Sequence, residues 1–382
     1  MRLPPYNMVL LDRLRRNDKT YTELVFYETD FLKTDNFLDL VTAILTNTSI
    51  QTVRFHDCGQ PKWSTKQLQL LFASIARLPN LTILSVSRTT LSLQALTILL
   101  RKATPLRELD IWGSELLGTE RDAVDLGEAL SLHSELEAMY LKRVTFHSSV
   151  TCLDPLLVAN QARMDRLLWD EVRWANGAIS RDSLAMLLRS SGLSQLRLEN
   201  LHLDEHHFYA LAKGLTKSCL RDLHLGHMEI LDTVASSFAQ AMVSNESLKR
   251  LVLFKCSLGN QAVSEIAKML KVNTTLEQVD LSENQFGDGG AVELANAVLM
   301  SSSIKRLELY GNANIGEKGV QVLMQLAEQN YVLEALNLFC LARKSTSYEQ
   351  IEIQKKINSY MKLNDDGTTR RSSGKWPKVW YE

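Results

Sequence analysis

Residues 248–286 read LKRLVLFKCSLGNQAVSEIAKMLKVNTTLEQVDLSENQF and contain one short apolar motif twice. Apolar residues stand at motif positions one, four, six and eleven, and Cys or Asn stands at position nine: Leu248-x-x-Leu251-x-Leu253-x-x-Cys256-x-Leu258 and Leu276-x-x-Val279-x-Leu281-x-x-Asn284-x-Phe286. Alternating apolar residues are typical of a strand with one buried face. Between the copies, apolar residues follow helical spacing at Val263, Ile266, Ala267 and Leu270. The stretch therefore predicts the order strand, turn, helix, turn and strand.

The same motif recurs along most of the chain with a period of about 28 residues. Twelve copies begin at Tyr21, Ile50, Leu81, Leu106, Leu136, Met164, Leu193, Leu220, Leu248, Leu276, Ile304 and Leu333. One such unit cannot bury its own apolar face, so its neighbours must cover it. Parallel strands lie about 4.8 Å apart, whereas packed helices need about 8–10 Å, so the stack must curve. We expect a right-handed α/β solenoid, an arc of about twelve strand-turn-helix units with the parallel sheet concave and the helices convex.

The ends of the chain differ from the repeats and predict covers for them. We expect an N-terminal capping helix in residues 1–20, the solenoid in residues 21–341, a C-terminal capping helix in residues 342–363 and a flexible tail in residues 364–382. Capping helices are needed because an uncovered terminal repeat exposes an edge strand and an apolar face. The tail carries two Trp residues. It is an untethered segment, a segment packed back on the last repeat, or a linear interaction motif.

These repeats resemble leucine-rich repeats of the ribonuclease-inhibitor type over roughly residues 21–341. Residues 267–276 (AKMLKVNTTL) and the opening residues 14–18 (LRRND) are also similar to the repeat domain of tropomodulins. The resemblance implies a fold more directly than a function. Position nine departs from the family's Asn or Cys in more than half of the copies, at Thr29, Thr89, Ser114, Val144, Val172, Leu201 and Met228. The ladder of buried Asn side chains is therefore incomplete, and residues 136–219 are the most irregular repeats.

Four asparagines stand three residues before a strand motif, at Asn47, Asn245, Asn273 and Asn330. Because Asn tolerates the left-handed backbone conformation that closes a helix, we expect these residues to be helix C-caps. Three of them also begin Asn-x-Ser/Thr triplets, and Asn80 begins a fourth. The structural role accounts for those three without glycans.

Composition limits the class of protein and its partners. Of 382 residues, 45% are hydrophobic and 23% charged, which indicates a folded rather than a disordered chain. Lys and Arg total 43 and Asp and Glu 44, so bulk charge favours no nucleic-acid partner. Apolar runs are too short for a membrane helix or an export signal, and five Cys residues are too few for a disulfide framework. We expect the cytoplasm, or alternatively the nucleus, and no membrane partner.

No residue pattern points to catalysis, so we expect no enzyme, no catalytic residue, no cofactor and no metal. Residues 287–290 (GDGG) are interpreted as a turn and helix start rather than a phosphate loop. Five histidines cluster in sequence, but the register places some on the inner face and others at the start of an outer helix: His202, His206, His207, His224 and His227. We expect them to be surface histidines. Cys58 and Cys256, at position nine, are expected to be buried structural thiols.

The inner face of the predicted sheet is the expected binding surface. Side chains at positions two, three, five, seven and eight of each motif should face solvent there. Large aromatic and cationic residues at these positions are candidates for protein contacts, since Trp, Tyr and Arg dominate interface energetics. The candidates are Trp112, Tyr140, Lys142, Arg143, Arg197, Phe254, Lys255 and Tyr310, with Phe339 beside Tyr310. Stacking of aromatic side chains on one another across strands is the alternative explanation.

Together these features favour a non-enzymatic scaffold that binds a protein partner on its concave face. The resemblance to tropomodulins implies one alternative, a cytoskeletal, actin-associated role. That family's long tropomyosin-binding extension has no counterpart in the twenty residues before the first repeat. Regulation of an enzyme is a second alternative, as in leucine-rich-repeat activators of GTPases. The acidic C-terminal run typical of those proteins is absent from this sequence.

Overall fold

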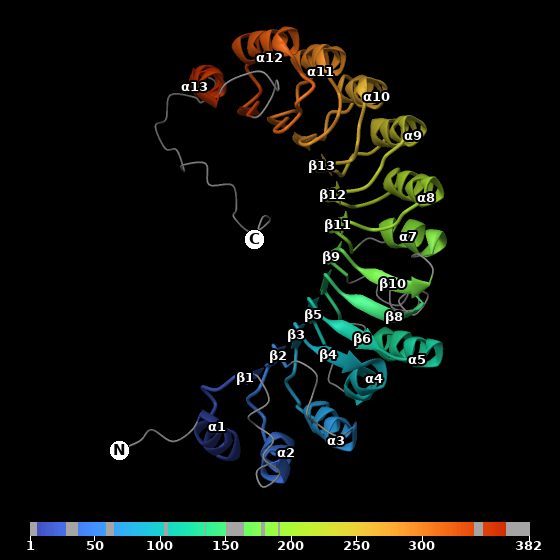
Figure 1. Ribbon diagram of the computed structural model, residues 1–382, viewed down its shortest axis with the longest axis vertical. Coiled ribbons are helices and arrows are strands. Elements are labelled where there is room, and N and C mark those ends of the chain that lie inside the picture. Colours follow the sequence, from blue (N-terminus) through green and yellow to red (C-terminus); the bar gives the residue numbers. More distant parts are fainter. Residues whose placement is uncertain are drawn as a thin grey trace.

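Twelve parallel strands form one sheet along the inside of an arc, in chain order (Figure 1). The computed structural model describes residues 6–27, 37–58, 65–102, 106–133, 135–149, 164–176, 180–189, 192–339 and 347–363. The strands are β1 (Glu23–Tyr27), β2 (Thr52–His56), β3 (Ile83–Ser87), β5 (Glu108–Trp112), β7 (Ala138–Lys142), β9 (Arg166–Asp170), β11 (Gln195–Glu199), β12 (Asp222–Gly226), β13 (Arg250–Phe254), β14 (Gln278–Asp280), β15 (Arg306–Glu308) and β16 (Ala335–Asn337). The predicted α/β solenoid is confirmed.

Helices cover the outside of the arc and bury the apolar face of the sheet (Figure 1). They are α1 (Tyr6–Arg15), α2 (Phe37–Leu45), α3 (Thr65–Ile75), α4 (Leu93–Lys102), α5 (Glu120–Ser131), α7 (Arg181–Leu188), α8 (Glu205–Leu215), α9 (Asp232–Val243), α10 (Asn260–Leu270), α11 (Asp288–Met300), α12 (Glu317–Gln329) and α13 (Ser347–Leu363). The predicted helix start after Gly287 is confirmed, since Gly287 is the N-cap of α11. In the described part of the chain, no helix is both long and apolar enough to cross a membrane.

A helix lies at each end of the arc (Figure 1). In α1, Leu10, Leu11 and Leu14 are buried in the core. At the other end, Gln354 of α13 donates from Nε2 to the Leu336 carbonyl at 2.8 Å, and its Oε1 accepts from the Leu338 N–H at 2.9 Å. The side chain thus satisfies backbone groups of the last strand that no further strand pairs. The domain boundaries themselves stay a prediction, and the tail at residues 364–382 lies outside the described residues.

A second parallel sheet of four strands was not expected from the sequence. It consists of β4 (Thr90–Ser92), β6 (Glu115–Leu117), β8 (Thr145–Ser149) and β10 (Arg173–Asn176), in the spatial order β10-β8-β6-β4. It replaces the predicted turns in the third to sixth repeats. The Thr145 N–H donates to the Ser114 carbonyl at 3.0 Å, and the Arg173 N–H donates to the Val144 carbonyl at 2.8 Å. In the fifth and sixth repeats the Val side chain at position nine has no hydrogen-bonding group, and backbone pairing satisfies the loops instead. In the third and fourth repeats the hydroxyls of Thr89 and Ser114 also accept, from the N–H groups of Cys58 and Thr89.

Where position nine is Asn, the side chain performs this role. Asn284 Oδ1 accepts from the N–H groups of Cys256 and Leu258, at 2.9 and 3.1 Å. Its Nδ2 donates to the carbonyls of Leu253 and Leu281, at 2.8 and 2.9 Å. A single buried amide therefore joins two repeats and satisfies four backbone groups of their turns.

Asn330 is the C-cap of α12, as predicted, whereas the C-caps of α9 and α10 are Ser244 and Lys271. The left-handed conformation expected of the four asparagines is wrong. Asn330 has φ −94°, and none of the four asparagines is among the described residues with positive φ. Instead, each Oδ1 accepts from the backbone N–H groups two and three residues later, as in the 2.8 and 2.7 Å bonds to Asn330. In three of them Nδ2 donates to the preceding repeat: Asn245 to Leu215, Asn273 to Met242 and Asn330 to Val298. These side chains form a second amide ladder, and their burial leaves no room for glycans.

His133 occupies the corresponding place in the fourth repeat. Its Nε2 donates to the Leu100 carbonyl at 2.7 Å, and its Nδ1 accepts from the Leu106 N–H at 3.1 Å. This bonding pattern requires the neutral ring. Burial disfavours the imidazolium and lowers the pKa of His133 below its ordinary value, although the Leu100 carbonyl acts in the opposite direction.

Replacement of this histidine by the ladder's usual residue, His133→Asn, should make the fold less sensitive to acid. Since the folded-state pKa is lowered, the unfolded chain binds a proton first, and stability falls as pH decreases below about 6.5. We expect the thermal midpoint of the native chain to drop more between pH 7.5 and 5 than that of H133N, as measured by circular dichroism. His147→Asn, at an exposed histidine, is the control. The same pH dependence in all three proteins would contradict the assignment.

Ten consecutive strands of the large sheet, β2 to β15, are each followed by a residue with positive φ at motif position eight. They are Asp57, Arg88, Gly113, Arg143, Glu171, Asn200, His227, Lys255, Glu283 and Gly311. Each donates its N–H to the carbonyl of the residue at position seven of the next motif, as Glu283 does to Tyr310 at 2.7 Å. The left-handed conformation thus adds one backbone hydrogen bond between neighbouring repeats. That bond offsets part of the steric cost of the positive φ.

Substitutions at Glu283 should reveal that cost. Glu283 has φ +56°, which glycine adopts readily and a β-branched residue does not. Glu283→Val should lower the free energy of unfolding by about 1–2 kcal/mol relative to Glu283→Gly, as measured by chemical denaturation. A valine variant as stable as the glycine variant would show that the backbone there is not left-handed.

Candidate functional site

The inner face of the large sheet carries two adjacent rows of side chains, one at motif position five and one at position seven. In the first row, Asp110, Tyr140, Leu168, Arg197 and His224 are successive partners in register. In the second row, Trp112, Lys142, Asp170, Glu199, Gly226 and Phe254 are successive partners. The strand register therefore fixes which of the predicted contact residues lie together.

The two large aromatic side chains near the middle of the arc are half-buried and covered by arginines. Arg88 Cζ lies 5.6 Å from the centroid of the Trp112 ring. Arg166 Cζ lies 5.8 Å from the centroid of the Tyr140 ring. Sequence analysis identified both rings but missed both arginines. The sequence could have predicted the contact between Arg166 and Tyr140, because Arg166 is at position three of the next motif and therefore on the same face as Tyr140.

Lys142 and Arg143 extend this region to the end of β7. Lys142 is half-buried and pairs in register with Trp112. Arg143 is exposed, has φ +52° and places its Nε 3.3 Å from a carboxylate oxygen of Glu171. Glu171 also pairs with Arg173. Because these ion pairs are at the surface, each contributes little to the stability of the fold. A partner can therefore replace them with contacts of its own at little cost in free energy.

Arg197 differs from the other candidates because most of its side chain is buried. It forms an ion pair with Glu199 at 2.8 Å, and Glu199 also bonds to His224. Burial opposes ionisation of Glu199, but the bonds from His224 and Arg197 outweigh it and lower its pKa to about 2. Arg197 and Tyr140 line the same small hollow on the inner face. Arg197 is therefore part of an internal charge cluster with Glu199 and His224, whether or not it also contacts a partner.

The C-terminal candidates lie on other strands of the same face. The Phe254 ring is 5.2 Å from the His227 ring, and the next residue, Lys255, is exposed. The Tyr310 ring is stacked on Phe339, with centroids 6.3 Å apart and planes 8° from parallel. The structure thus places the predicted residues along the arc from β5 to just beyond β15, rather than in one cluster.

Beside this aromatic pair, sequence analysis missed two buried carboxyl groups. Asp280 and Glu308 are partners in register and are 8% and 9% exposed. Burial and the neighbouring Asp280 charge raise the pKa of Glu308 to about 7, against a bond from Asn337 that lowers it. Neither carboxylate forms an ion pair with a Lys or Arg in the described part of the chain. The signal in the sequence was Asp and Glu at position five of consecutive motifs.

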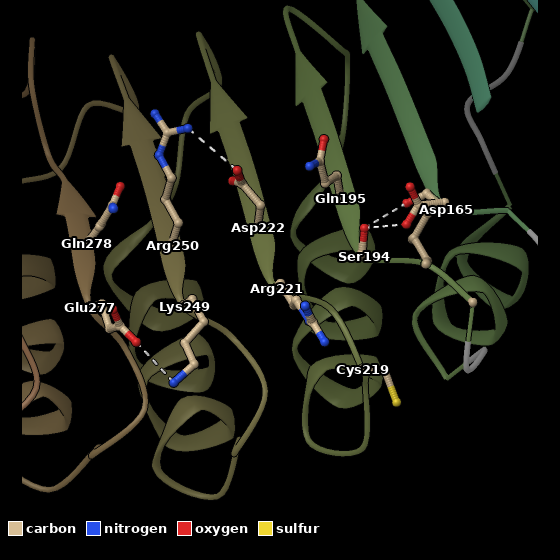
Figure 2. Close-up of a pocket in the computed structure, with 12 residues that line it drawn as sticks. Asp165, Ser194, Gln195, Cys219, Arg221, Asp222, Lys249, Arg250, Glu277 and Gln278 are labelled. Atoms are coloured by element: carbon tan, nitrogen blue, oxygen red, sulfur yellow. Dashed lines mark hydrogen bonds and ion pairs between the residues drawn. The ribbon is translucent and has the colours of Figure 1, made fainter. Parts of the chain in front are cut away.

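A groove of about 660 Å³ runs along the edge where β11 to β14 begin (Figure 2). Its charges are largely paired: Lys249 with Glu277 at 3.2 Å, and Arg250 with Asp222 at 3.5 Å. Figure 2 shows Arg221 between these pairs and Ser194. None of the eight predicted contact residues lines this groove. It lies on the predicted inner face at motif positions two and three, away from the eight candidate residues.

The histidines and cysteines differ in burial. His202, His206 and His227 are exposed, as expected. His207 is 5% exposed and forms a capping box with Asp204 at the start of α8, so the expectation of a surface histidine is wrong there. His224 is half-buried and pairs with Glu199. Burial raises the pKa of the Cys58 thiol to about 11 and that of Cys256 to about 12, and the prediction of buried thiols is confirmed. Within the described ranges, no group of three or more His, Cys, Asp or Glu could hold a metal ion.

One strand-turn-helix unit of this chain matches a family of known repeats. A family model described as Leucine Rich repeat matches residues 272–295, which run from the end of α10 through β14 into α11. The fold is an α/β solenoid, and the matched segment is one of its repeats. Whether its repeats are of the ribonuclease-inhibitor type stays a prediction. No curated protein matches the chain.

Two solved structures are similar to parts of this solenoid. One is leiomodin-1 actin-binding site 2, with 20% identity and a TM-score of 0.31 over 35% of this chain and 75% of that one. The other is the tropomodulin C-terminal domain of Caenorhabditis elegans, with 12% identity and a TM-score of 0.34 over 42% of this chain and 95% of that one. Scores this low carry no argument about what this chain binds.

Removal of the buried charge at Glu308 should stabilise the protein at alkaline pH. Because its folded-state pKa is raised above 4.5, the folded chain keeps a proton that the unfolded chain has lost. The contribution to stability therefore decreases as pH rises from about 4.5 to about 7. Glu308→Gln should raise the free energy of unfolding by about 1–3 kcal/mol at pH 8 and much less at pH 5. Denaturant titrations measure both.

The control for this prediction is Glu328→Gln, which removes the same charge from an exposed position on α12. It should leave the stability at either pH within about 0.5 kcal/mol of the native value. An equal gain from both variants would indicate a general charge effect rather than burial of Glu308.

Proposed function

We propose that this protein is a non-enzymatic scaffold that binds a protein partner on its concave face. The observation that carries the proposal is the pair of half-buried rings, Trp112 and Tyr140, on the inner face of β5 and β7. Both rings are next to cations, which makes them suitable anchors in an interface. The core lies on the other side of the sheet, so folding alone does not account for aromatic side chains here.

The rigidity of the surface supports this proposal. Amide ladders join neighbouring repeats toward the C-terminal end, and the second sheet joins the third to sixth repeats. A surface held in this way loses little conformational entropy when a partner binds. The strongly lowered pKa of Glu199 is explained by internal pairing with Arg197 and His224 rather than by a catalytic task.

We also infer the cytoplasm, or the nucleus, as the compartment, with no cofactor, nucleic-acid or membrane partner in the proposed role. Cys58, Cys219 and Cys256 are free thiols, as expected in a reducing environment. An actin-associated role and regulation of an enzyme such as a GTPase remain the two alternatives. Both alternatives involve contacts with another protein, so the binding experiment described next can also test them.

Loss of the two rings and the adjacent cation should abolish partner binding. We expect the full chain to capture a partner from its native cell lysate, and the triple variant Trp112→Ala/Tyr140→Ala/Arg143→Ala to lose it. With the identified partner purified, the affinity should fall by more than about thirtyfold, because truncated anchors typically cost about 2 kcal/mol or more. Calorimetry measures this change, and circular dichroism confirms that the variant is folded. Purified actin, tested directly, decides the cytoskeletal alternative.

The matched control is Tyr331→Ala, at an aromatic residue that is 82% exposed in the loop between α12 and β16. It removes a tyrosine without changing the inner face and should capture the same partner. Equal capture by the triple variant and the native chain would show that the concave surface around β5 and β7 is not the binding site.

A further inference from the structure

The inner face near the C-terminal end of the arc contains two carboxyl groups and two aromatic rings side by side. Asp280 and Glu308 are register partners on β14 and β15, and Tyr310 follows Glu308 by two residues on the same face. Phe339 is stacked on Tyr310. We call these four residues the carboxylate–aromatic patch.

The charges of this patch are not neutralised by the fold in the way that those of the middle strands are. Glu199 has Arg197 and His224 in contact, whereas no Lys or Arg in the described ranges forms an ion pair with Asp280 or Glu308. Asp280 accepts the Ser282 N–H at 2.9 Å, and Asn337 bonds to Glu308. These bonds satisfy some oxygens but bring no positive charge. Arg306 and Arg250 act on Glu308 without forming an ion pair with it, and they do not offset its burial, because its pKa stays raised. A buried acidic pair without a directly bonded cation is costly, and an external cation can relieve that cost.

The aromatic half of the patch is accessible. Tyr310 is 38% exposed although it stands on the concave side, and Phe339 is half-buried beside it. The two rings are nearly parallel, and the exposed part of Tyr310 offers an aromatic surface two residues along the chain from Glu308. A planar cation can stack on such a surface while its N–H groups reach the carboxylates.

We propose that the carboxylate–aromatic patch binds an arginine side chain in an extended segment of the protein partner. The inference rests on the proposed scaffold function and specifies one contact within it. Arginine fits better than lysine because its guanidinium is planar and donates in parallel to two oxygens, whereas an ammonium group is a point charge that stacks poorly. Charge complementarity on a strand face selects the occupant here, and a nucleic acid or an acidic peptide would be repelled.

Protonation gives this contact a specific signature. Glu308 faces Asp280 on β14, Arg306 on its own strand, Asn337 on β16 and Arg250 on β13. In the free protein its raised pKa, about 7, leaves it partly protonated at neutral pH. A bound guanidinium favours the carboxylate, so binding at pH 7 should release a proton to the buffer.

The test is calorimetric titration of the full chain with the peptide acetyl-Gly-Arg-Gly-amide at pH 7. Titrations in two buffers of different ionisation enthalpy measure the proton release. We expect saturable binding with net proton release, and on the order of tenfold weaker binding by the peptide with citrulline in place of arginine. The lysine peptide should also bind more weakly than the arginine peptide.

Two variants separate the patch from general electrostatics. Glu308→Gln should weaken binding by about tenfold and abolish the proton release, and it should not unfold the chain because it removes a buried charge. Glu328→Gln makes the same charge change on the convex face and should bind as the native chain does. Equal affinity in the two variants, no proton release, or equal binding of the citrulline peptide would each overturn the proposal.

The chain's own tail is a competing occupant because it carries Arg370 and Arg371. If the full-length variant Arg370→Ala/Arg371→Ala binds the arginine peptide more than tenfold more tightly than the native chain, the tail is the occupant, and the proposal of a partner arginine is overturned. Unchanged affinity supports the proposal.

Failure of the proposed arginine contact can be distinguished from failure of the proposed scaffold function. A captured partner whose affinity is insensitive to Glu308→Gln would refute this contact and leave the scaffold intact. Specific arginine binding without any captured partner would support the patch and refute the broader proposal.

Discussion

The difference between the spacing of strands and that of helices governs this molecule. Parallel strands lie about 4.8 Å apart and packed helices about 8–10 Å apart, so units joined one to one form an arc with the sheet inside (Figure 1). Side chains on the inner face converge and lose water. Asp170, Glu199, Asp280 and Glu308 face the concave side, yet each is at most 9% exposed. This crowding makes charge pairing decisive there.

A second constraint is that each turn of the solenoid must satisfy its backbone polar groups. The chain uses two solutions. Toward the C-terminal end, Asn284 and Asn312 bridge the turns with their side chains. In the third to sixth repeats the loops extend into a second sheet, and in the last two of these Val144 and Val172 have no side-chain group that could bridge the turns. The irregular repeats are therefore a different way of meeting the same requirement.

The sequence predicted what depends on periodicity and missed what depends on neighbouring repeats. The apolar period of about 28 residues specified the strands and the helices between them. It could not predict the second sheet, because loop pairing arises only when repeats stack, nor that His133 replaces an amide. For the candidate site, position in the motif placed Trp112 and Tyr140 correctly on the inner face. Their arginine neighbours and the burial of Arg197 depend on strand register and curvature, which a single motif does not contain.

Charge pairing then divides the concave face into two kinds of surface. In the middle strands, Arg166 covers Tyr140, and Arg197 holds Glu199, so a partner must compete with contacts that the fold already makes. Binding there gains mainly from covering apolar rings. On β14 and β15, an added cation meets carboxyl groups with which no described Lys or Arg forms an ion pair, although Arg306 and Arg250 act on Glu308 at longer range. Affinity and charge selectivity would consequently reside on different strands, and a substitution that weakens one need not change the other.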